Sequence, residues 1–343
     1  MNFSFINEFL IEPTKLTTKL YQYSSITISS LGCVFNLLCF LIFNTNKFSK
    51  KKLYFFLKVY ALNSLLVNSL QFFTFLAGIL RITHLTNTFE YIAFKSYAYS
   101  PIVTTCYFFS GVLDSYILME RCSHFFSKLK VLFQPSPRLA CFALFGACLL
   151  INSPYFFIKK TTASSEFNST FVVHHSVESS FGTSTFGRVL TFGVYFVRDI
   201  ATLVSVVGWN VLLCVSVRTH TNTRNERFNF SRRDCSVSKN RTTSETSFQR
   251  NSREYRLTFI IIIICSISVV EHSFQIVSNV YSNYVSDTIS DYLNKVSDVT
   301  LAFKQSSNFL VFGFLDRNFD RALTNFFRRC LQSKCVAFNM REY

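Results

Sequence analysis

The chain has 343 residues, of which 49% are hydrophobic, 17% are aromatic and only 16% are charged, and its formal net charge at pH 7 is +16. Its 42 phenylalanines are far above the usual share, and so low a charged fraction excludes most soluble folds. The composition therefore predicts a membrane protein.

Apolar segments of membrane-spanning length recur along the chain. A helix needs about 20 apolar residues to cross the hydrocarbon core of a bilayer. Spans are expected at residues 24–43, 53–80, 97–119, 139–158, 189–217, 257–281 and 296–315. The third and seventh are the least apolar because they carry Asp114 and, in the seventh, Asp298 and Lys304, as is typical of helices that face a bundle interior. The predicted fold class is an all-α membrane protein with a seven-transmembrane helix bundle over residues 24–315.

The segments outside these spans complete the predicted organisation. Residues 1–23 form an N-terminus without the basic region and short apolar core of a signal peptide. Residues 218–256 are rich in Ser, Thr, Asn and basic side chains, so they are expected to be largely disordered away from their helical ends. This loop is either a docking and phosphorylation segment or a solvated connector. Residues 316–343 form a basic tail.

Lysine and arginine predict the orientation, because basic loops resist translocation and accumulate in the cytoplasm. With the N-terminus outside, the four inner segments hold 24 of the 35 basic residues and the four outer segments hold 8. Anionic lipid of the inner leaflet is the expected partner of this charge. Nucleic acid is not an expected partner, since the basic residues are spread over four short segments. The predicted location is the plasma membrane, with several passes and the N-terminus outside.

All eleven cysteines fall within the predicted spans or on the predicted inner side, so no disulfide framework, metal site or cofactor is expected. Cys330 and Cys335, in the basic tail, are candidate palmitoylation sites or else unmodified thiols. Asn2 and Asn168 begin glycosylation sequons in outer segments. Two further sequons lie in the inner loop 218–256, so the pattern also arises by chance.

Polar motifs occur in a fixed order along the spans. They are Asn36 in the first span, Asn63-Ser64 in the second, Glu120-Arg121-Cys122 at the end of the third, Asn308-Phe309-Leu310-Val311-Phe312 in the seventh, and Phe314 to Leu323 after it. In order and spacing they resemble the rhodopsin-like (class A) G-protein-coupled receptors, in particular divergent invertebrate receptors of the neuropeptide and chemosensory type. The resemblance covers nearly the whole chain.

This resemblance implies a receptor that passes the signal of an extracellular ligand, a peptide or small chemosensory molecule, to a cytoplasmic heterotrimeric G protein. Arg121 would pair with Glu120 at rest and swing inward on activation, unless it is an arginine that only snorkels to the interface. Asn308 would hydrogen-bond between helices, and Phe312 would pack near Arg121. A short amphipathic helix would follow the seventh span along the membrane.

Several positions depart from the family pattern. Ser96 stands near the position of the usual bridging cysteine, and spans five to seven contain no proline. The sixth span carries Glu271 and His272 where the family has a cysteine-tryptophan-x-proline motif. With Arg198 and Asp199 of the fifth span, these are the candidate ligand contacts. Arg198 and Asp199 are adjacent, so their side chains are expected to diverge by about 100° and to contact the outer pocket more than each other.

A buried polar core is predicted from the charges and polar residues inside the spans. Its members are Asn36, Asn63, Ser64, Ser110, Asp114 and Lys304. An unpaired charge at mid-membrane costs about 3 kcal/mol, so Lys304 is expected to pair with Glu271 or Asp114, or to face a wet cavity alone. Lys304→Ala should lower surface expression or shift basal activity, with partial rescue by Glu271→Ala.

Other functions receive less support from the sequence. Val103 and Ala302 stand where amine and retinal receptors would carry an aspartate and a lysine, which weakens both of these ligand classes. No nucleophile-base set or phosphate loop is present, so an enzyme is not expected. The alternative class is a seven-span ligand-gated channel or transporter, although no internal repeat supports it.

Overall fold

The structure is a computed structural model of the chain. It describes the backbone of residues 3–45, 48, 52–79, 88–126, 128–129, 133, 135–165, 172–234, 241–284 and 287–339. Side chains are described over residues 18–45, 48, 52–77, 88–126, 128–129, 133, 135–162, 176–219, 256–280 and 291–329.

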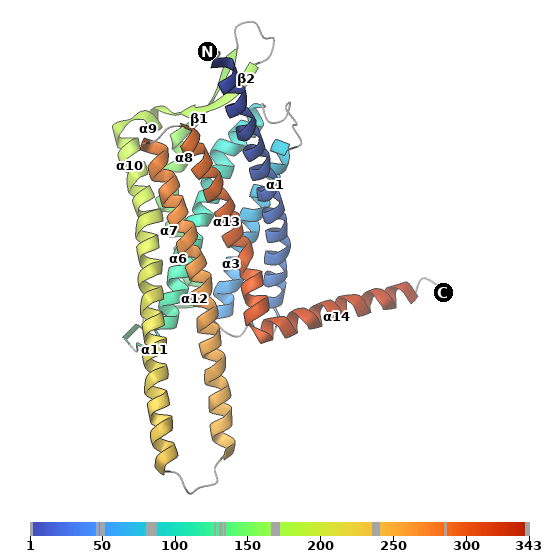
Figure 1. Cartoon of the computed structure of the whole chain (residues 1–343), viewed down its shortest axis with the longest axis vertical. Helices are drawn as coiled ribbons and strands as arrows, with labels where there is room; N and C mark the ends of the chain where they lie inside the picture. The colour runs from blue at the N-terminus through green and yellow to red at the C-terminus, as the bar shows by residue number, and fades with distance from the viewer. Residues whose placement is uncertain are drawn as a thin grey trace.

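Long helices dominate the described chain (Figure 1). They are α1 (Phe3–Phe43), α3 (Lys52–Ile79), α6 (Ser100–Cys122), α7 (Pro137–Asn152), α10 (Thr185–Tyr195), α11 (Thr202–Asp234), α12 (Arg241–Tyr284), α13 (Asp287–Leu315) and α14 (Arg317–Asn339). The shorter elements are α5 (Phe89–Ala93), α8 (Tyr155–Ile158), α9 (Ser180–Thr183), the π-helical turns η1 (Phe94–Tyr99) and η3 (Phe196–Ala201), and the strands β1 (Lys159–Ser165) and β2 (Val172–Glu178). Each π-helical turn is continuous with the helices beside it. Two long rods result, namely α5–η1–α6 and α10–η3–α11.

Six helical segments of the described chain are long and apolar enough to cross a membrane. They are Thr18–Phe43, Lys52–Ala77, Phe89–Cys122, Pro137–Ile158, Thr185–Thr219 and Arg256–Val280. Each contains most of one of the first six predicted spans, so the chain is a multi-pass, all-α membrane protein. The predicted seventh segment, residues 296–315, lies within α13. That helix is not among the six, since it carries Asp291, Lys295, Asp298 and Lys304.

Two helix starts that shape the bundle follow from local capping. Ser136 accepts a hydrogen bond at 3.3 Å from the backbone N–H of Leu139, ahead of the proline that opens α7. Asp316 accepts one at 2.8 Å from the N–H of Asn318 and separates α13 from α14. Such caps satisfy otherwise free amides and contribute about 1 kcal/mol each. Asp316 thus marks the point from which α14 leaves the bundle sideways (Figure 1).

Helix α13 is part of the bundle and packs against α1, α3 and α12, while α11 packs against α6 and α12. An aromatic cluster closes the bundle where α13 ends. The ring of Phe43 lies 5.3 Å from that of Phe312 and 5.5 Å from that of Phe319. Beside them, Tyr54 donates a hydrogen bond at 3.2 Å to Asp316. The cluster therefore joins α1, α3, α13 and α14.

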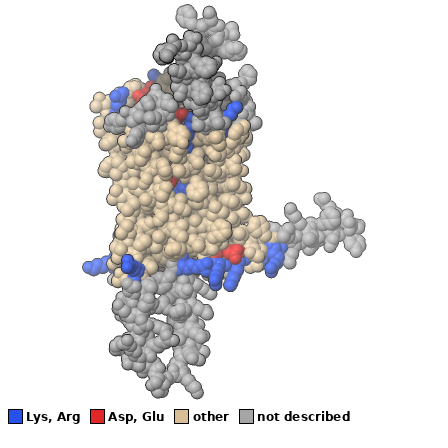
Figure 2. All heavy atoms as spheres, in the orientation of Figure 1, with Lys and Arg blue, Asp and Glu red and all other residues tan. Residues whose placement is uncertain are grey.

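The two ends of the bundle differ in charge. Figure 2 shows that the middle of this face carries few Lys, Arg, Asp or Glu, with a small charged spot near its centre, and that Lys and Arg gather along its lower edge. This edge, called here the basic end, includes the exposed Lys52 at the start of α3, Arg138 in α7 and Arg317 in α14. A largely uncharged surface between charged ends is typical of a protein whose middle lies in lipid.

The opposite end carries the hairpin of β1 and β2, which pair antiparallel from Lys159 with Glu178 to Ser165 with Val172. We call it the hairpin end (Figure 1). Ser176 of β2 and Ser96 of η1 share a hydrogen bond of 2.8 Å between their hydroxyls. A neutral hydrogen bond therefore links the hairpin to the rod α5–η1–α6, near the position where the resemblance leads one to expect a cysteine.

Helices extend into the segment 218–256 from both sides. Helix α11 continues to Asp234 and α12 begins at Arg241, in line with the helical ends expected of this loop, whereas its disorder between those ends stays a prediction. Residues 218–256 contain neither proline nor glycine. Once a helix is started by the packed span, each added residue gains one hydrogen bond with nothing to interrupt it.

Candidate functional site

The acid-arginine pair lies at the basic end, in the last turn of α6. The side chains of Glu120 and Arg121 are buried, and Arg121 Nε lies 3.5 Å from Glu120 Oε2. On the other side, His124 Nε2 lies 3.6 Å from Glu120 Oε1. The carboxylate thus lies between a guanidinium and an exposed imidazole. That this pair belongs to a resting state stays a prediction.

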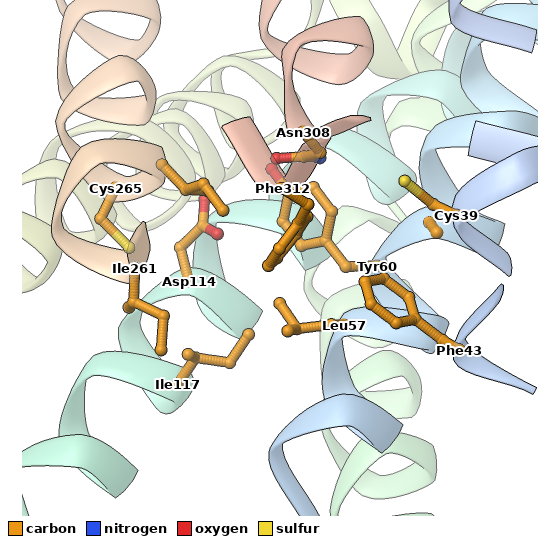
Figure 3. A pocket seen from close by; sticks show the side chains of 12 residues that line it. Cys39, Phe43, Leu57, Tyr60, Asp114, Ile117, Ile261, Cys265, Asn308 and Phe312 are labelled. Atoms are coloured by element: carbon orange, nitrogen blue, oxygen red, sulfur yellow. The ribbon is translucent and has the colours of Figure 1, made fainter. Parts of the chain in front are cut away.

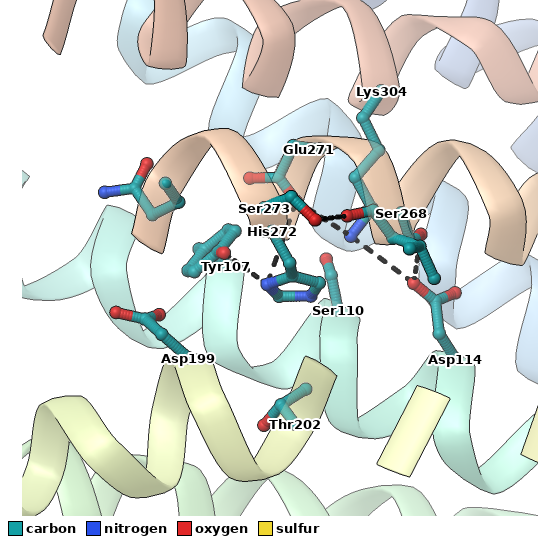
Figure 4. Close-up of polar contacts among 12 residues, drawn as sticks. Tyr107, Ser110, Asp114, Asp199, Thr202, Ser268, Glu271, His272, Ser273 and Lys304 are labelled. Carbon is teal, nitrogen blue, oxygen red and sulfur yellow. Dashed lines mark hydrogen bonds and ion pairs between the residues drawn. The ribbon is translucent and has the colours of Figure 1, made fainter. Parts of the chain in front are cut away.

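A buried ionic cluster lies farther along the bundle, between α6, α12 and α13 (Figure 4). Lys304 Nζ is 3.3 Å from Asp114 Oδ2 and 3.7 Å from Glu271 Oε2, and all three residues are 1% exposed. Ser268 of α12 donates a hydrogen bond to Asp114 at 2.6 Å. Both predicted partners of Lys304 are therefore in range, with Asp114 the nearer, and the cluster ties three helices together.

His272 extends this polar layer toward α6. Its Nδ1 shares a short hydrogen bond with the hydroxyl of Tyr107 and lies 4.0 Å from Glu271 Oε2. The helices approach closely because position 111 is glycine. A Cβ there would come 2.6 Å from Thr202 Cγ2 and 2.8 Å from His272 Nε2. Gly111 therefore allows α6 to pack against both α11 and α12 at this level.

Gln305, which the sequence analysis did not single out, joins the remaining members of the polar core. Its backbone oxygen accepts from Asn36 at 2.7 Å, and its side-chain oxygen accepts a short hydrogen bond from Ser64. Its side-chain nitrogen donates to Ser110 at 3.4 Å, and Ser110 also accepts from Asn63 at 2.8 Å. The polar run Lys-Gln-Ser-Ser at 304–307 was the signal in the sequence that could have identified it.

Asn308 and Phe312 lie between this core and the basic end. Asn308 is 4% exposed, and its Nδ2 has no hydrogen-bond partner among the described residues, so the interhelical hydrogen bond expected of this side chain stays a prediction. Phe312 is 2% exposed and packs on Phe43 and Phe319 of the aromatic cluster. Its proximity to Arg121 stays a prediction.

A small cavity opens beside these residues (Figure 3). Its volume is about 10 Å³, and its lining includes Tyr60, Asp114, Asn308, Phe312 and Cys265. The hydroxyl of Tyr60 has no hydrogen-bond partner within the described part of the chain, like Asn308 Nδ2. The space is close to the minimum for one water molecule, which polar partners of this kind can hold.

The prediction that the side chains of Arg198 and Asp199 diverge was wrong, whereas their role as candidate ligand contacts stays a prediction. Their side chains bind each other through two hydrogen bonds, from Arg198 Nε at 2.8 Å and from Nη2 at 2.5 Å. Arg198 also donates to Tyr155 at 3.2 Å, and Asn279 donates to Asp199 at 3.3 Å. Both residues lie in η3 and both are buried. A long arginine side chain can fold back onto its neighbour, and a buried charge requires a partner.

The predicted modification sites are not tested by these contacts. Asn2 and Asn168 lie outside the described residues, and the side chains of Cys330 and Cys335 lie beyond those described. Of the described cysteines, all eight are free thiols, namely Cys33, Cys39, Cys106, Cys122, Cys141, Cys148, Cys214 and Cys265.

No family model matches the chain, and no curated protein matches it significantly. The class that fold and composition define is thus a multi-pass helical membrane protein with a charged, buried core.

Proposed function

We propose that this protein is a divergent rhodopsin-like G-protein-coupled receptor of the plasma membrane. The observation that carries the proposal is the buried pair of Glu120 and Arg121 at the basic end of the rod α5–η1–α6. An arginine held in a turn at a membrane boundary, beside two helices that extend past it, can be released toward a partner protein on that side. A purely topogenic arginine has no need of burial or of an adjacent acid.

In this proposal α13 is the seventh span and its polar residues face inward. Lys304, Gln305 and Asn308 are all buried, whereas Phe303 and Leu310 of the same helix are exposed. That division is what a helix with one lipid-facing side and one bundle-facing side requires. The N-terminus and hairpin end then face outward, the basic end faces the cytoplasm, and α14 lies along the membrane surface with its arginines near anionic lipid.

Activation would couple the ionic cluster to the acid-arginine pair. At rest, Ser268 and Lys304 hold α12 against α6 and α13 through Asp114. An outward movement of the basic end of α12 would open a crevice at Arg121, which would leave Glu120 and bind a segment of the heterotrimeric G protein. Such a movement needs two discrete arrangements of the same helices, and the ligand has to favour one of them.

An extracellular ligand, a peptide or small chemosensory molecule, would act from the hairpin end. Its candidate contacts are the buried Arg198–Asp199 pair of η3 and the buried Glu271 and His272 of α12. Ligand binding would strengthen some of these contacts and weaken others. It would so favour the outward position of α12 over its resting position.

Basal signalling tests the proposal without a known ligand. Glu120→Gln removes one charge of the switch, and a partly buried pair of this kind is worth about 1 kcal/mol. Ligand-independent activation in a cell-based panel of G proteins should therefore rise about fivefold. Addition of Arg121→Ala should abolish the signal, whereas Arg138→Ala, at an exposed basic site, should not. A protein that activates no G protein in any variant, and instead conducts current in G-protein-free liposomes, would be a channel.

A further inference from the structure

The ionisable side chains buried in the middle of the bundle do not balance in charge. Three carboxylates, Asp114, Asp199 and Glu271, stand against two cations, Arg198 and Lys304. With all five groups ionised, the described interior would carry one uncompensated negative charge. An ionised group without a counter-charge is strongly disfavoured away from water, and in practice it takes up a proton.

The hydrogen bonds distinguish the three carboxylates. Asp199 accepts two hydrogen bonds from Arg198, so its charge is matched. Asp114 accepts a hydrogen bond and is the nearer of the two carboxylates to Lys304. Glu271 is 1% exposed, and neither of its oxygens accepts a hydrogen bond of good geometry from a described residue, the neutral hydroxyl of Tyr107 being the polar group beside it. The ionised form of Glu271 is therefore the least compensated.

Every element packed around Glu271 has to be considered as an alternative place for the proton. The titratable groups that face it are Tyr60 on α3, Tyr107 and Asp114 on α6, Asp199 on η3, His272 on α12 and Lys304 on α13. Among them only His272 could carry the missing positive charge. Its Nε2 is buried and has no acceptor within the described structure, so an imidazolium would leave a charged N–H unsatisfied.

We propose that Glu271 is a proton-binding site and that it is a neutral carboxylic acid at pH 7. Lys304 and Asp114 then form a complete ion pair, and Glu271 lies beside it as an acid held on α12. Loss of the proton would give Lys304 a second anionic partner 3.7 Å away and strengthen the link between α12 and α13. The proton is needed to balance the charge of the buried side chains. The site would therefore exist whether or not the protein couples to a G protein.

Infrared spectroscopy of the purified protein in lipid nanodiscs tests the site directly. The spectrum of the wild-type protein minus that of Glu271→Gln should contain the carbonyl-stretch band of one protonated carboxylic acid. Glu120→Gln is the matched control, since Glu120 is also buried but has charged partners, and its difference spectrum should lack the band. Lys304→Met should add a second acid band, because Asp114 then loses its cation and takes up a proton.

Thermal unfolding gives an independent measurement. Glutamine imitates a protonated glutamic acid, so Glu271→Gln should melt within about 2 °C of the wild type. A flat wild-type minus Glu271→Gln difference spectrum would overturn the proposal, as would a large fall in melting temperature for this variant. An imidazolium signal that Glu271→Gln removes would place the proton on His272 and would also overturn it. If Lys304→Met does not fold, the two glutamate variants still decide the question.

Discussion

Replacement of Lys304 by methionine probes the strongest electrostatic contact of the buried core. Two unit charges 3.3 Å apart, as for Lys304 and Asp114, interact by about 5 kcal/mol at an effective dielectric constant of about 20. Part of this energy offsets the desolvation of the two groups, and loss of one partner of a buried pair typically costs about 3–5 kcal/mol. Methionine keeps most of the volume of the side chain, so the electrostatic loss should dominate over any packing defect.

The expected result is a fall in melting temperature of about 5–10 °C for Lys304→Met. Asp114→Asn in the same chain should recover a large part of this fall, because the carboxylate that lost its cation is then neutral. Glu271→Gln combined with Lys304→Met should recover little, since Glu271 is already neutral in the proposed state. Thermal unfolding of the wild type, the three single variants and the two double variants in one detergent gives the two coupling energies.

The reverse order of rescue would refute this reasoning. If Glu271→Gln restores stability more than Asp114→Asn does, Glu271 is the charged partner of Lys304. The sequence analysis implied that outcome, since it expected Glu271→Ala to rescue Lys304→Ala in part. Independent, additive losses in both double variants would mean that Lys304 faces a wet cavity and pairs with neither carboxylate.

Two further predictions concern helix packing and the hairpin end. Gly111→Ala should destabilise the protein by about 1–3 kcal/mol in thermal unfolding, because its Cβ would overlap Thr202, whereas Gly208→Ala, with open space around it, should not. Ser96→Cys with Ser176→Cys should form a disulfide, seen as a mobility shift on non-reducing gels, and raise stability by about 2–4 kcal/mol. A pair of thiols that stays reduced in oxidising buffer would show that the hairpin does not lie against η1 as described.

Hydropathy was sufficient for the number and place of the six apolar spans, because lipid requires about 20 consecutive apolar residues whatever the neighbouring helices are. The burial of Asp114 and Lys304 also followed from the sequence, since a charge within a span is stable only inside the bundle. The two candidate partners of Lys304 could be named but not ranked, because sequence spacing gives a helix face and not a distance between helices.

Contacts between distant residues were decided by the tertiary structure alone. Gln305 joins α1, α3 and α6 only because these helices converge on one level of α13. The pairing of Arg198 with Asp199 contradicted the ideal-helix geometry on which the sequence prediction depended, since η3 is a π-helical turn and arginine is long enough to fold back. The sequence by itself determined which side chains must avoid lipid. Which of them meet, and hence which carboxylate keeps its charge, depends on ångström-scale distances between helices that no local pattern contains.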